Sequence, residues 1–309
     1  MTVLIRHFIL SLSTAFYLSK KNLIFFFNVF LIRFFFAFTY IRELFYPTKY
    51  LFEDYKSHFF TKKLSVIDVI NSLTNFGYYN KFQLEENTLQ KIKNEINFQN
   101  SFIYSKESSK NQLIQFTTND QLDDIVKKSI LKNLAHVALD IDIEKTKTIK
   151  NLINNSVLKQ IARSYIGSRK ILVTAQCYIS NPMNVSEQTK KNNAQYFHYD
   201  LDFKKFLKVF IYLDDVCEKS GPHTFVSKTH KYKRFKHILA ERLDDEEILK
   251  YYEKNDLIKF IGDKGSVIIE DTFGLHKGEF PQNNSRKMLI LIFGIPPGIE
   301  KYRYKKILD

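Results

Sequence analysis

Two strand-like stretches, residues 195–231 and 265–293, restrict the fold of this chain more than any other part of its sequence. The first contains His198 and Asp200 ahead of an aromatic and β-branched run, and the second contains His276 ahead of another apolar strand. Successive side chains of a β-strand point to opposite faces, so His198 and Asp200 share a face and reach a common point. Two histidines and one carboxylate form the ligand face that holds non-haem Fe(II) and leaves other coordination positions open. The sequence therefore predicts a metal site between strands that are distant along the chain.

A histidine followed two positions later by an acid is a weak signal by itself. With 8 His and 33 acidic residues in 309, about 0.9 such pairs are expected by chance, so a surface histidine beside a solvated carboxylate is the plain alternative. The context favours the metal site. A buried-strand pattern at Phe206–Leu213 follows the motif, and the Ser220–Pro222 turn then leads to a second strand at Thr224–Ser227.

Arg286 lies ten residues after His276, at the start of an apolar strand. A guanidinium is planar, donates two parallel hydrogen bonds and keeps its charge, which suits it to clamping a carboxylate. Nine residues of the chain are Arg, and one would fall by chance in a three-residue window after His276 in about 9% of cases. The arginine therefore adds support for a site that binds an acid.

These motifs resemble those of the phytanoyl-CoA dioxygenase family of Fe(II)/2-oxoglutarate oxygenases. The similar segments read HYD at 198–200, LKVFIYLDDVCEKSGPHTFVSKTHK at 207–231, and GDKGSVIIEDTFGLHKG at 262–278, with Arg286 beyond them. The similarity begins near Ile67 and runs nearly to the C-terminus. In combination the motifs are specific to the family, but not to one reaction within it.

The resemblance implies an α+β, mainly β fold, in which helices brace a double-stranded β-helix (jelly-roll, cupin-like) core. This oxygenase domain would span residues 61–309, and residues 1–60 would form a basic, aromatic-rich helical appendage outside the resemblance. Apolar spacing and glycine stops predict bracing helices at 65–76, 84–96, 121–138 and 152–166. His136 would then be an ordinary helix residue, and residues 99–119 a loop with an edge strand.

The resemblance also implies a chemistry. Fe(II) would be held by His198, Asp200 and His276, 2-oxoglutarate would chelate the metal, and Arg286 would pair with its far carboxylate. With O2 as the other cosubstrate, a C–H bond of the substrate is hydroxylated while succinate and CO2 are released. Asp200 favours hydroxylation or another oxidation, because halogenating relatives lack this ligand. The expected substrate is a small molecule, a sugar or a lipid-linked compound.

The strand Ile171–Ile179 precedes the first metal ligand and places Gln176 and Tyr178 on one face. By resemblance this strand supplies a polar contact to the cosubstrate, for which Gln176 is the candidate. The plain alternative is a hydrogen-bonded amide in the core. Tyr178 is a candidate for contact with the substrate.

Gly278 departs from the family pattern, because relatives often place a serine there against the cosubstrate. Thr272 or Ser285 is expected to compensate. His223 follows the Gly-Pro turn, where many relatives carry an apolar residue, and it either contacts the substrate or lies on the rim of the site. Residues 234–260 form an insertion that is expected to lie over the opening.

The N-terminal residues 23–41 are nearly all apolar, which is long enough for a membrane span. Arg33 near the middle opposes insertion by roughly 2.5–3.5 kcal/mol, and Asn28 opposes it further. Three arrangements remain open: a helix docked on the protein's own core, an interfacial helix on the inner membrane face, and a true span.

The formal net charge of +14 could suit an anionic partner. Lys outnumbers Arg by 38 to 9, and neither an Arg cluster nor an RNA-binding aromatic motif is present, so nucleic acid is not an expected partner. Peripheral membrane contact through residues 1–45 is the other partner that the sequence suggests, while it does not indicate the oligomeric state.

Cys177 and Cys217, the two cysteines of the chain, lie in apolar strand patterns. Buried thiols in a reducing cytoplasm are expected rather than a disulfide framework. His230 and His237 lie in a basic segment and are expected to be solvated. The predicted location is therefore cytoplasmic, with or without association with the inner face of a membrane.

Two other function classes stay open at the level of sequence. A different metal-dependent barrel, such as an isomerase, would keep the three ligands but would not need Arg286. A non-catalytic, membrane-proximal binding module would keep the fold without turnover.

Overall fold

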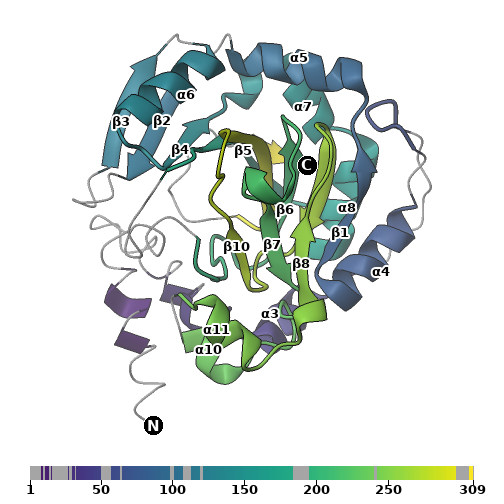
Figure 1. Ribbon diagram of the computed structural model, residues 1–309. Helices are drawn as coiled ribbons and strands as arrows, with labels where there is room; N and C mark the ends of the chain where they lie inside the picture. Colours follow the sequence, from purple (N-terminus) through teal and green to yellow (C-terminus); the bar gives the residue numbers. More distant parts are fainter. Residues whose placement is uncertain are drawn as a thin grey trace.

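The computed structural model of the chain is shown in Figure 1. It describes residues 8–9, 11–13, 15, 27, 30–31, 33–49, 57–62, 65–97, 101–106, 113–118, 121–183, 195–239, 242–296 and 306–308. In 101–106 and 113–118 the description covers the backbone. The apolar stretch 23–41 lies partly outside the described residues.

Two antiparallel sheets form the centre of the described part of the chain. The larger sheet has nine strands in the order β1-β9-β6-β11-β5-β4-β2-β3, with β12 pairing with β5, and the smaller has the order β10-β7-β8. The strands of the larger sheet are β1 (Tyr78–Gln83), β2 (Ser101–Lys106), β3 (Leu113–Thr118), β4 (His136–Asp140), β5 (Ile171–Ser180), β6 (Phe206–Tyr212), β9 (Ser266–Glu270), β11 (Arg286–Gly294) and β12 (Lys306–Leu308). Those of the smaller sheet are β7 (His223–Val226), β8 (Leu257–Phe260) and β10 (His276–Gly278).

Alternation along the central strands gives the larger sheet two different faces. On β5, Cys177 belongs to the apolar core beneath the helices, whereas its neighbour Tyr178 packs with Phe210, Phe225 and Ile290 between the two sheets. The sheets therefore face each other around an interior, and helices cover the outer face of the larger one. This arrangement is the predicted double-stranded β-helix.

Helices surround the sheets, with α4, α5, α7 and α8 on one side and α3, α10 and α11 at the lower end in Figure 1. The α-helices are α3 (Thr39–Phe45), α4 (Val66–Phe76), α5 (Glu86–Asn97), α6 (Leu122–Leu131), α7 (Lys147–Ile153), α8 (Ser156–Ile166), α10 (Phe235–Leu239) and α11 (Asp245–Leu249). Three short 3-10 helices are η1 (Ile143–Lys145), η2 (Glu218–Ser220) and η3 (Lys254–Asp256).

The predicted helix at 65–76 is confirmed together with its two ends. Ser65 caps α4 by accepting the Asp68 N–H, and Gly77 ends it at φ +91°, in the left-handed region where glycine is favoured. A side chain at Gly77 would also collide with Phe225 and His230. The glycine is thus required by both the backbone and the close packing of α4 on the smaller sheet.

The predicted helix at 121–138 is wrong in its second half. It ends with α6 at Leu131, and His136 begins the strand β4, which pairs with β5 through His136↔Ser180. Burial on the sheet overrides the helical spacing of this apolar segment. The helix predicted at 152–166 ends at Ile166 before Gly167 as expected, but it begins at Ser156 with Asn155 as its cap, because residues 152–153 end α7. Residues 99–119, expected to be a loop with an edge strand, contain β2 and the edge strand β3.

The N-terminal helix α3 is docked on the domain by polar contacts. The guanidinium of Arg42 is buried 3.4 Å from Asp271, and Glu43 forms an ion pair with the buried Lys205 at 2.9 Å. Lys205 also donates to the carbonyl of Tyr46 at 2.8 Å. Among the described residues, no helix combines the length and the apolar character needed to cross a bilayer.

Candidate metal centre

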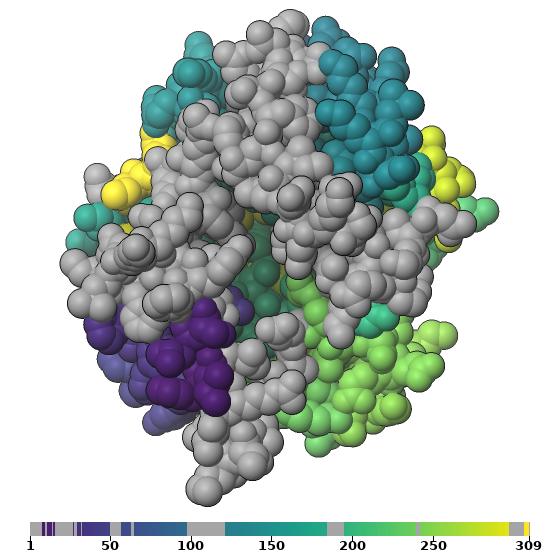
Figure 2. Space-filling view, turned by 90° about the vertical axis from the view of Figure 1, so that its left-hand side faces the viewer, coloured from purple at the N-terminus to yellow at the C-terminus, as the bar shows by residue number. Residues whose placement is uncertain are grey.

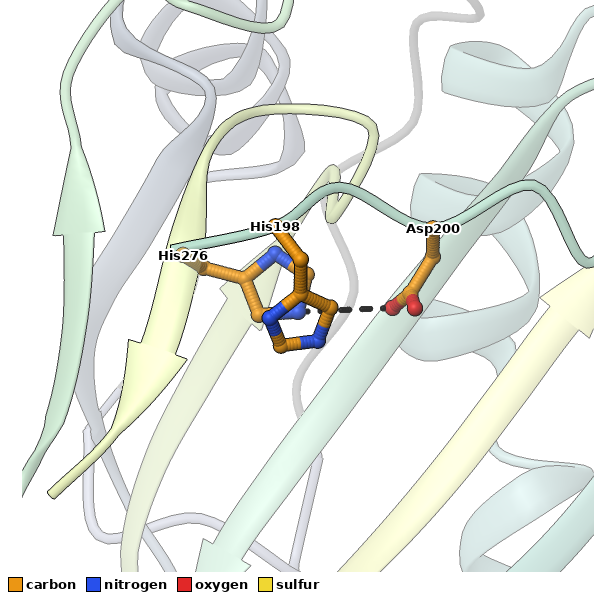
Figure 3. Close-up of side chains that lie close together, drawn as sticks. All are labelled: His198, Asp200 and His276. Carbon is orange, nitrogen blue, oxygen red and sulfur yellow. Dashed lines mark ion pairs between the residues drawn. The ribbon is translucent and has the colours of Figure 1, made fainter. Parts of the chain in front are cut away.

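The structure brings together the three predicted metal ligands. His198 and His276 exchange both backbone hydrogen bonds, at 3.0 and 2.8 Å, and Asp200 N–H donates to the carbonyl of Thr272 at 2.8 Å. Ligand atoms of His198, Asp200 and His276 all lie within 4.8 Å of one another. In Figure 3 the two imidazoles lie side by side with the Asp200 carboxylate directed at them, and a dashed line marks the 3.4 Å contact between His276 Nε2 and Asp200.

Both imidazoles are held in the orientation that metal binding needs. His198 Nδ1 lies 3.0 Å from the carbonyl of Tyr196, and His276 Nδ1 lies 3.0 Å from the carbonyl of Gly274. A carbonyl accepts, so each Nδ1 carries the proton and each Nε2 presents its lone pair. Burial lowers the pKa of His198 well below its usual value, which keeps the ring neutral. The donor set therefore fits Fe(II).

Lys208, on the inner face of β6, is a charged neighbour of this centre that the sequence analysis missed. Its ammonium lies 2.6 Å from Asp200 and 3.2 Å from Asp202. Burial alone would raise the pKa of Asp200, yet Lys208 and the two histidines hold it well below its usual value. The alternation of the 206–212 strand, which places Lys208 on the same face as Phe206 and Phe210, was the signal that could have found it.

Arg286 lies in the interior, near the smaller sheet. Its Nη1 donates to the carbonyl of Gly221, and its Nη2 donates to Ser180 Oγ at 3.2 Å. A Cβ placed on Gly278, two residues after His276, would lie 3.2 Å from Arg286 Nη2. The guanidinium thus occupies the space beside Gly278, on the same inward face of β11 as Met288 and Ile290.

Ser180, rather than Ser285 or Thr272, is the hydroxyl that reaches Arg286. Ser180 is the cross-strand partner of both Arg286 and His136, and its Oγ lies 3.5 Å from His136 Nδ1. Ser285 donates instead to Asn181 at 2.7 Å, and the buried Thr272 hydroxyl has no partner among the described residues. Sequence reasoning missed Ser180 and His136 because their neighbourhood depends on β4 joining the sheet.

His223 is buried, so the alternative that places it on the rim is wrong. Its Nε2 lies 3.0 and 3.2 Å from the two oxygens of Glu270, and its ring centroid is 5.5 Å from that of His276. Burial raises the pKa of Glu270 to about 8 and lowers that of His223 to about 3. Glu270 was not predicted, although it is the cross-strand partner of Lys208 on β9. The role of His223 in substrate contact stays a prediction.

Gln176 and Tyr178 both face the interior from β5. Gln176 Nε2 donates to Asp140 Oδ1 at 2.6 Å, which is the hydrogen bond of a core amide, while its Oε1 is buried without a partner among the described residues. Tyr178 packs against His136 with ring centroids 4.7 Å apart, and burial raises its pKa to about 12. Their proposed contacts with cosubstrate and substrate stay predictions.

Three expectations of solvent exposure or burial are wrong. His230 and His237 are buried: His230 Nε2 contacts the carbonyl of Thr74 at 3.2 Å, and His237 Nδ1 contacts the hydroxyl of Tyr252 at 2.9 Å. Their segment is basic, but α3 and the 245–252 region pack over it, which local sequence does not reveal. Cys217 is exposed, because it precedes the 3-10 helix η2 rather than lying in a strand.

A cavity of about 570 Å³ adjoins the strands that carry the ligands. Its walls come from the segment before His198, from the start of α11 and from the end of β10, and they comprise Gln195, Tyr196, Asp244, Asp245, Glu246, Lys277, Glu279 and Phe280. Part of the 234–260 insertion therefore lies beside the metal-ligand strands.

Comparison with known proteins agrees with this architecture. The family model "Phytanoyl-CoA dioxygenase (PhyH)" matches residues 83–287. The solved structure of EctD from S. alaskensis with bound Fe is 11% identical, with a TM-score of 0.50, covering 78% of this chain and 83% of that one. AviO1 from Streptomyces viridochromogenes Tue57 is 14% identical (TM-score 0.48; 77% and 98% covered), and EvdO2 from Micromonospora carbonacea var. aurantiaca complexed with 2-oxoglutarate is 11% identical (TM-score 0.49; 78% and 96% covered). No curated protein sequence matches the chain.

At these identities the likeness to EctD shows the fold alone, and it confirms the double-stranded β-helix. The family model covers more than half of the chain and contains Asp200, His198 and His276 within its matched range. Fe(II), 2-oxoglutarate and O2 are the cofactor and cosubstrates of this class, and the interior described above fits them. The chain belongs to the phytanoyl-CoA dioxygenase family of non-haem Fe(II)- and 2-oxoglutarate-dependent oxygenases.

Proposed function

We propose that His198, Asp200 and His276 hold Fe(II), that Arg286 and Ser180 hold the far carboxylate of 2-oxoglutarate, and that the enzyme hydroxylates a C–H bond of its substrate. The observation that carries this proposal is the ligand face, in which three ligand atoms lie within 4.8 Å of one another. Both histidines are oriented by backbone carbonyls, so the face is formed by the fold itself.

The residues of the chain have separate tasks in this proposal. Bound Fe(II) and 2-oxoglutarate supply the oxidising chemistry for O2 activation, with succinate and CO2 as products. Arg286 orients the dianion through its fixed guanidinium, whose Nη2 also donates to Ser180. Lys208 keeps Asp200 ionised and fixes its carboxylate at 2.6 Å from the ammonium. The buried interior between the sheets excludes water from the ligand face.

The substrate is proposed to be a small molecule, a sugar or a lipid-linked compound. The cavity of about 570 Å³ beside the ligand strands has the size of a small-molecule site. Contact with a membrane through residues 1–45 is also a proposal, and what supports it is the set of exposed apolar side chains in that segment, such as Tyr40 and Phe45.

Succinate release from 2-oxoglutarate under air tests the proposal. We expect an Fe(II)-dependent signal in the wild type that is lost in His198→Ala and Arg286→Ala, while His58→Ala, which changes an exposed histidine, keeps it. Binding of 2-oxoglutarate to the anaerobic Fe(II) protein should give a metal-to-ligand charge-transfer band. Background succinate together with absence of the band would contradict the proposal.

The same charge-transfer band also distinguishes the roles of the Ser180 and Ser285 hydroxyls. Ser180→Ala removes a hydrogen bond at the arginine, and hydrogen bonds to charged groups contribute about 1.5–3 kcal/mol, so we expect 2-oxoglutarate to bind about tenfold or more weakly. Ser285→Ala serves as the matched control, because that hydroxyl donates to Asn181. Equal losses in both variants would remove Ser180 from the proposed site.

A further inference from the structure

Residues 33–45 and 228–236 form one continuous patch on the outside of the domain, here named the basic aromatic face. The hydroxyl of Thr39 donates to the carbonyl of His230 at 2.9 Å, and the rings of Phe38 and Phe235 stack with their centroids 6.4 Å apart. Figure 1 shows the same neighbourhood, with α3 beside α10 at the lower end of the molecule. Two segments from opposite halves of the chain therefore present a single surface.

Large apolar side chains point to water on both segments. The exposed fractions are 78% for Tyr40, 62% for Leu44 and 65% for Phe45 on α3, and 74% for Tyr232 and 51% for Phe235 on the other segment. Further exposed apolar side chains precede α3, namely Phe8, Ile9, Leu12, Phe27, Leu31 and Phe35. An exposed apolar patch of this kind marks a surface that binds another molecule.

Positive charge accompanies these side chains. Residues 228–236 read KTHKYKRFK, with five Lys or Arg and no acid. Lys228 and Arg234 are exposed, while the exposed Lys236 forms an ion pair with Glu247 at 2.5 Å and Lys233 donates inward to the carbonyl of Phe273. The one acid in residues 33–45, Glu43, is already paired with Lys205 at 2.9 Å. The basic aromatic face thus combines apolar contact area with charge that complements an anionic surface.

We propose that the basic aromatic face docks on an anionic lipid bilayer. Aromatic rings favour the headgroup level, aliphatic side chains enter the acyl boundary, and Lys and Arg pair with anionic headgroups. A single-stranded nucleic acid would also accept basic and aromatic side chains. The exposed aliphatic side chain of Leu44 would have no partner in such a complex, and it favours the bilayer.

The face is fixed in relation to the metal centre. On the inner side of α3, Arg42 lies 3.4 Å from Asp271 and 4.0 Å from the ring centroid of Phe273, in the turn that leads to His276. In Figure 2 the N-terminal residues, in purple, and the region around 235–250, in light green, lie on the two lower sides of a hollow. Docking would hold this hollow near the bilayer. Docking also adds to the proposed function, on which this step rests, because it implies that the substrate resides in the bilayer.

Sedimentation of the full chain with lipid vesicles tests the proposal. We expect binding to vesicles that contain phosphatidylglycerol, weaker binding to pure phosphatidylcholine, and loss of binding at high salt. Two sets of substitutions should each weaken binding about tenfold or more. The apolar set is Tyr40→Ser, Leu44→Ser and Tyr232→Ser, and the basic set is Lys228→Gln, Lys231→Gln and Arg234→Gln.

Controls change equal numbers of exposed apolar or basic residues elsewhere on the surface and should leave binding intact. The apolar controls are Leu131→Ser, Ile261→Ser and Ile307→Ser, and the basic controls are Lys81→Gln, Lys91→Gln and Lys170→Gln, all at exposed positions. Failure of the wild type to sediment with anionic vesicles would overturn the proposal, as would sedimentation that neither set weakens. Retention of a single-stranded oligonucleotide without vesicle binding would assign the face to nucleic acid instead.

Succinate release keeps the two proposals apart. If vesicle binding is absent while Fe(II)-dependent succinate release persists, docking is overturned and the oxygenase assignment of the site stands. If the protein binds vesicles while succinate release and the charge-transfer band are both absent, docking stands and the oxygenase assignment of the site is overturned. The basic aromatic face contains none of the proposed metal or cosubstrate ligands, so its variants should release succinate at the wild-type rate without vesicles.

Discussion

Lys208 places a positive charge between the partly buried Asp200 and the buried Asp202 at the metal centre, 2.6 Å from the first carboxylate and 3.2 Å from the second. Two ionised carboxylates so close together would repel each other, and burial would raise their pKa values. The ammonium of Lys208 offsets this repulsion and the effect of burial, so Asp200 is ionised in the folded protein. The lysine therefore supplies, beside Asp200, positive charge that a bound divalent cation would also supply.

Replacement of Lys208 by methionine removes the ammonium that lies 2.6 Å from Asp200. Removing one partner of a buried ion pair lowers the free energy of unfolding by about 3–5 kcal/mol, and we expect a loss of that size for Lys208→Met in the presence of EDTA. A cation held by Asp200 restores positive charge. Mn(II) should therefore raise the melting temperature of the variant by more than that of the wild type, which calorimetry measures.

Lys287→Met is the matched control for this prediction. Lys287 also bridges two aspartates, at 2.8 Å from Asp123 and 3.4 Å from Asp214, but on the outer face of β11. Its loss should change stability without changing the response to Mn(II). An equal Mn(II) response in both variants would mean that Lys208 has no part in the metal centre.

Motif spacing in the sequence predicted those residues of the metal centre that belong to a known pattern. The three ligands meet within 4.8 Å, and Arg286 lies in the same interior. Ser180, Lys208 and Glu270 were not foreseen, because each owes its place to a cross-strand partner. Strand register determines which of these side chains points into the interior, and a single sequence does not show that register.

Helix α3 connects the N-terminal segment to the turn that ends at His276. Asp271, at the start of this turn, accepts from Arg42 at 3.4 Å, from the Tyr165 hydroxyl at 2.7 Å and from Phe273 N–H at 3.0 Å. Burial alone would raise the pKa of Asp271, but Arg42 and His230 hold it below its usual value. The helix is thus an integral support of the turn.

Arg42→Met should weaken the attachment of α3 to this turn. It removes the guanidinium that forms the ion pair with Asp271 at 3.4 Å, so we expect the free energy of unfolding to fall by about 3 kcal/mol in urea titrations at neutral pH. Asp271 has a lowered pKa in the folded state, so its stabilising contribution is present above its unfolded pKa and is lost as pH falls through the folded value. The difference between wild type and variant should therefore shrink in acid.

Arg169→Met, at an exposed position after α8, provides the control for Arg42. It should stay within about 0.5 kcal/mol of the wild type, as surface substitutions usually do. A loss for Arg42→Met no larger than that of the control would show that α3 is not needed to hold the turn.

Helix C-termini were predicted where a glycine stop marked them, as at Gly77 after α4 and Gly167 after α8. The error at 121–138 has a physical cause. Residues 137–139 are apolar on both faces of the buried strand, and a short apolar run of this kind does not separate helix from strand by periodicity. Long-range pairing with β5 decided the outcome.

At the scale of the whole molecule, the fold class followed from the order of the motifs, but the packing of α3 on residues 228–236 did not. His230 illustrates this. Its segment is basic and reads as solvated, yet its carbonyl accepts from Thr39 of α3 and its ring contacts the Thr74 carbonyl of α4. A buried histidine joins the N-terminal segment, the first bracing helix and the smaller sheet.

This burial predicts sensitivity to mild acid. Burial lowers the pKa of His230 to about 4, with Lys231 and Lys233 acting in the same direction and Asp271 and the Thr74 carbonyl opposing them. An unfolded histidine has a pKa of about 6.5, so below that pH the unfolded state binds the extra proton. The contribution of His230 is therefore complete above pH about 6.5 and is lost as pH falls toward 4, by up to about 3 kcal/mol.

We expect His230→Gln to be less stable than the wild type at pH 7.5. On acidification the variant should lose stability less steeply, by up to about 1.4 kcal/mol per pH unit. Urea unfolding across this range measures the slope, His58→Gln at an exposed position should leave it unchanged, and parallel slopes for the wild type and His230→Gln would show that His230 takes up its proton equally in both states.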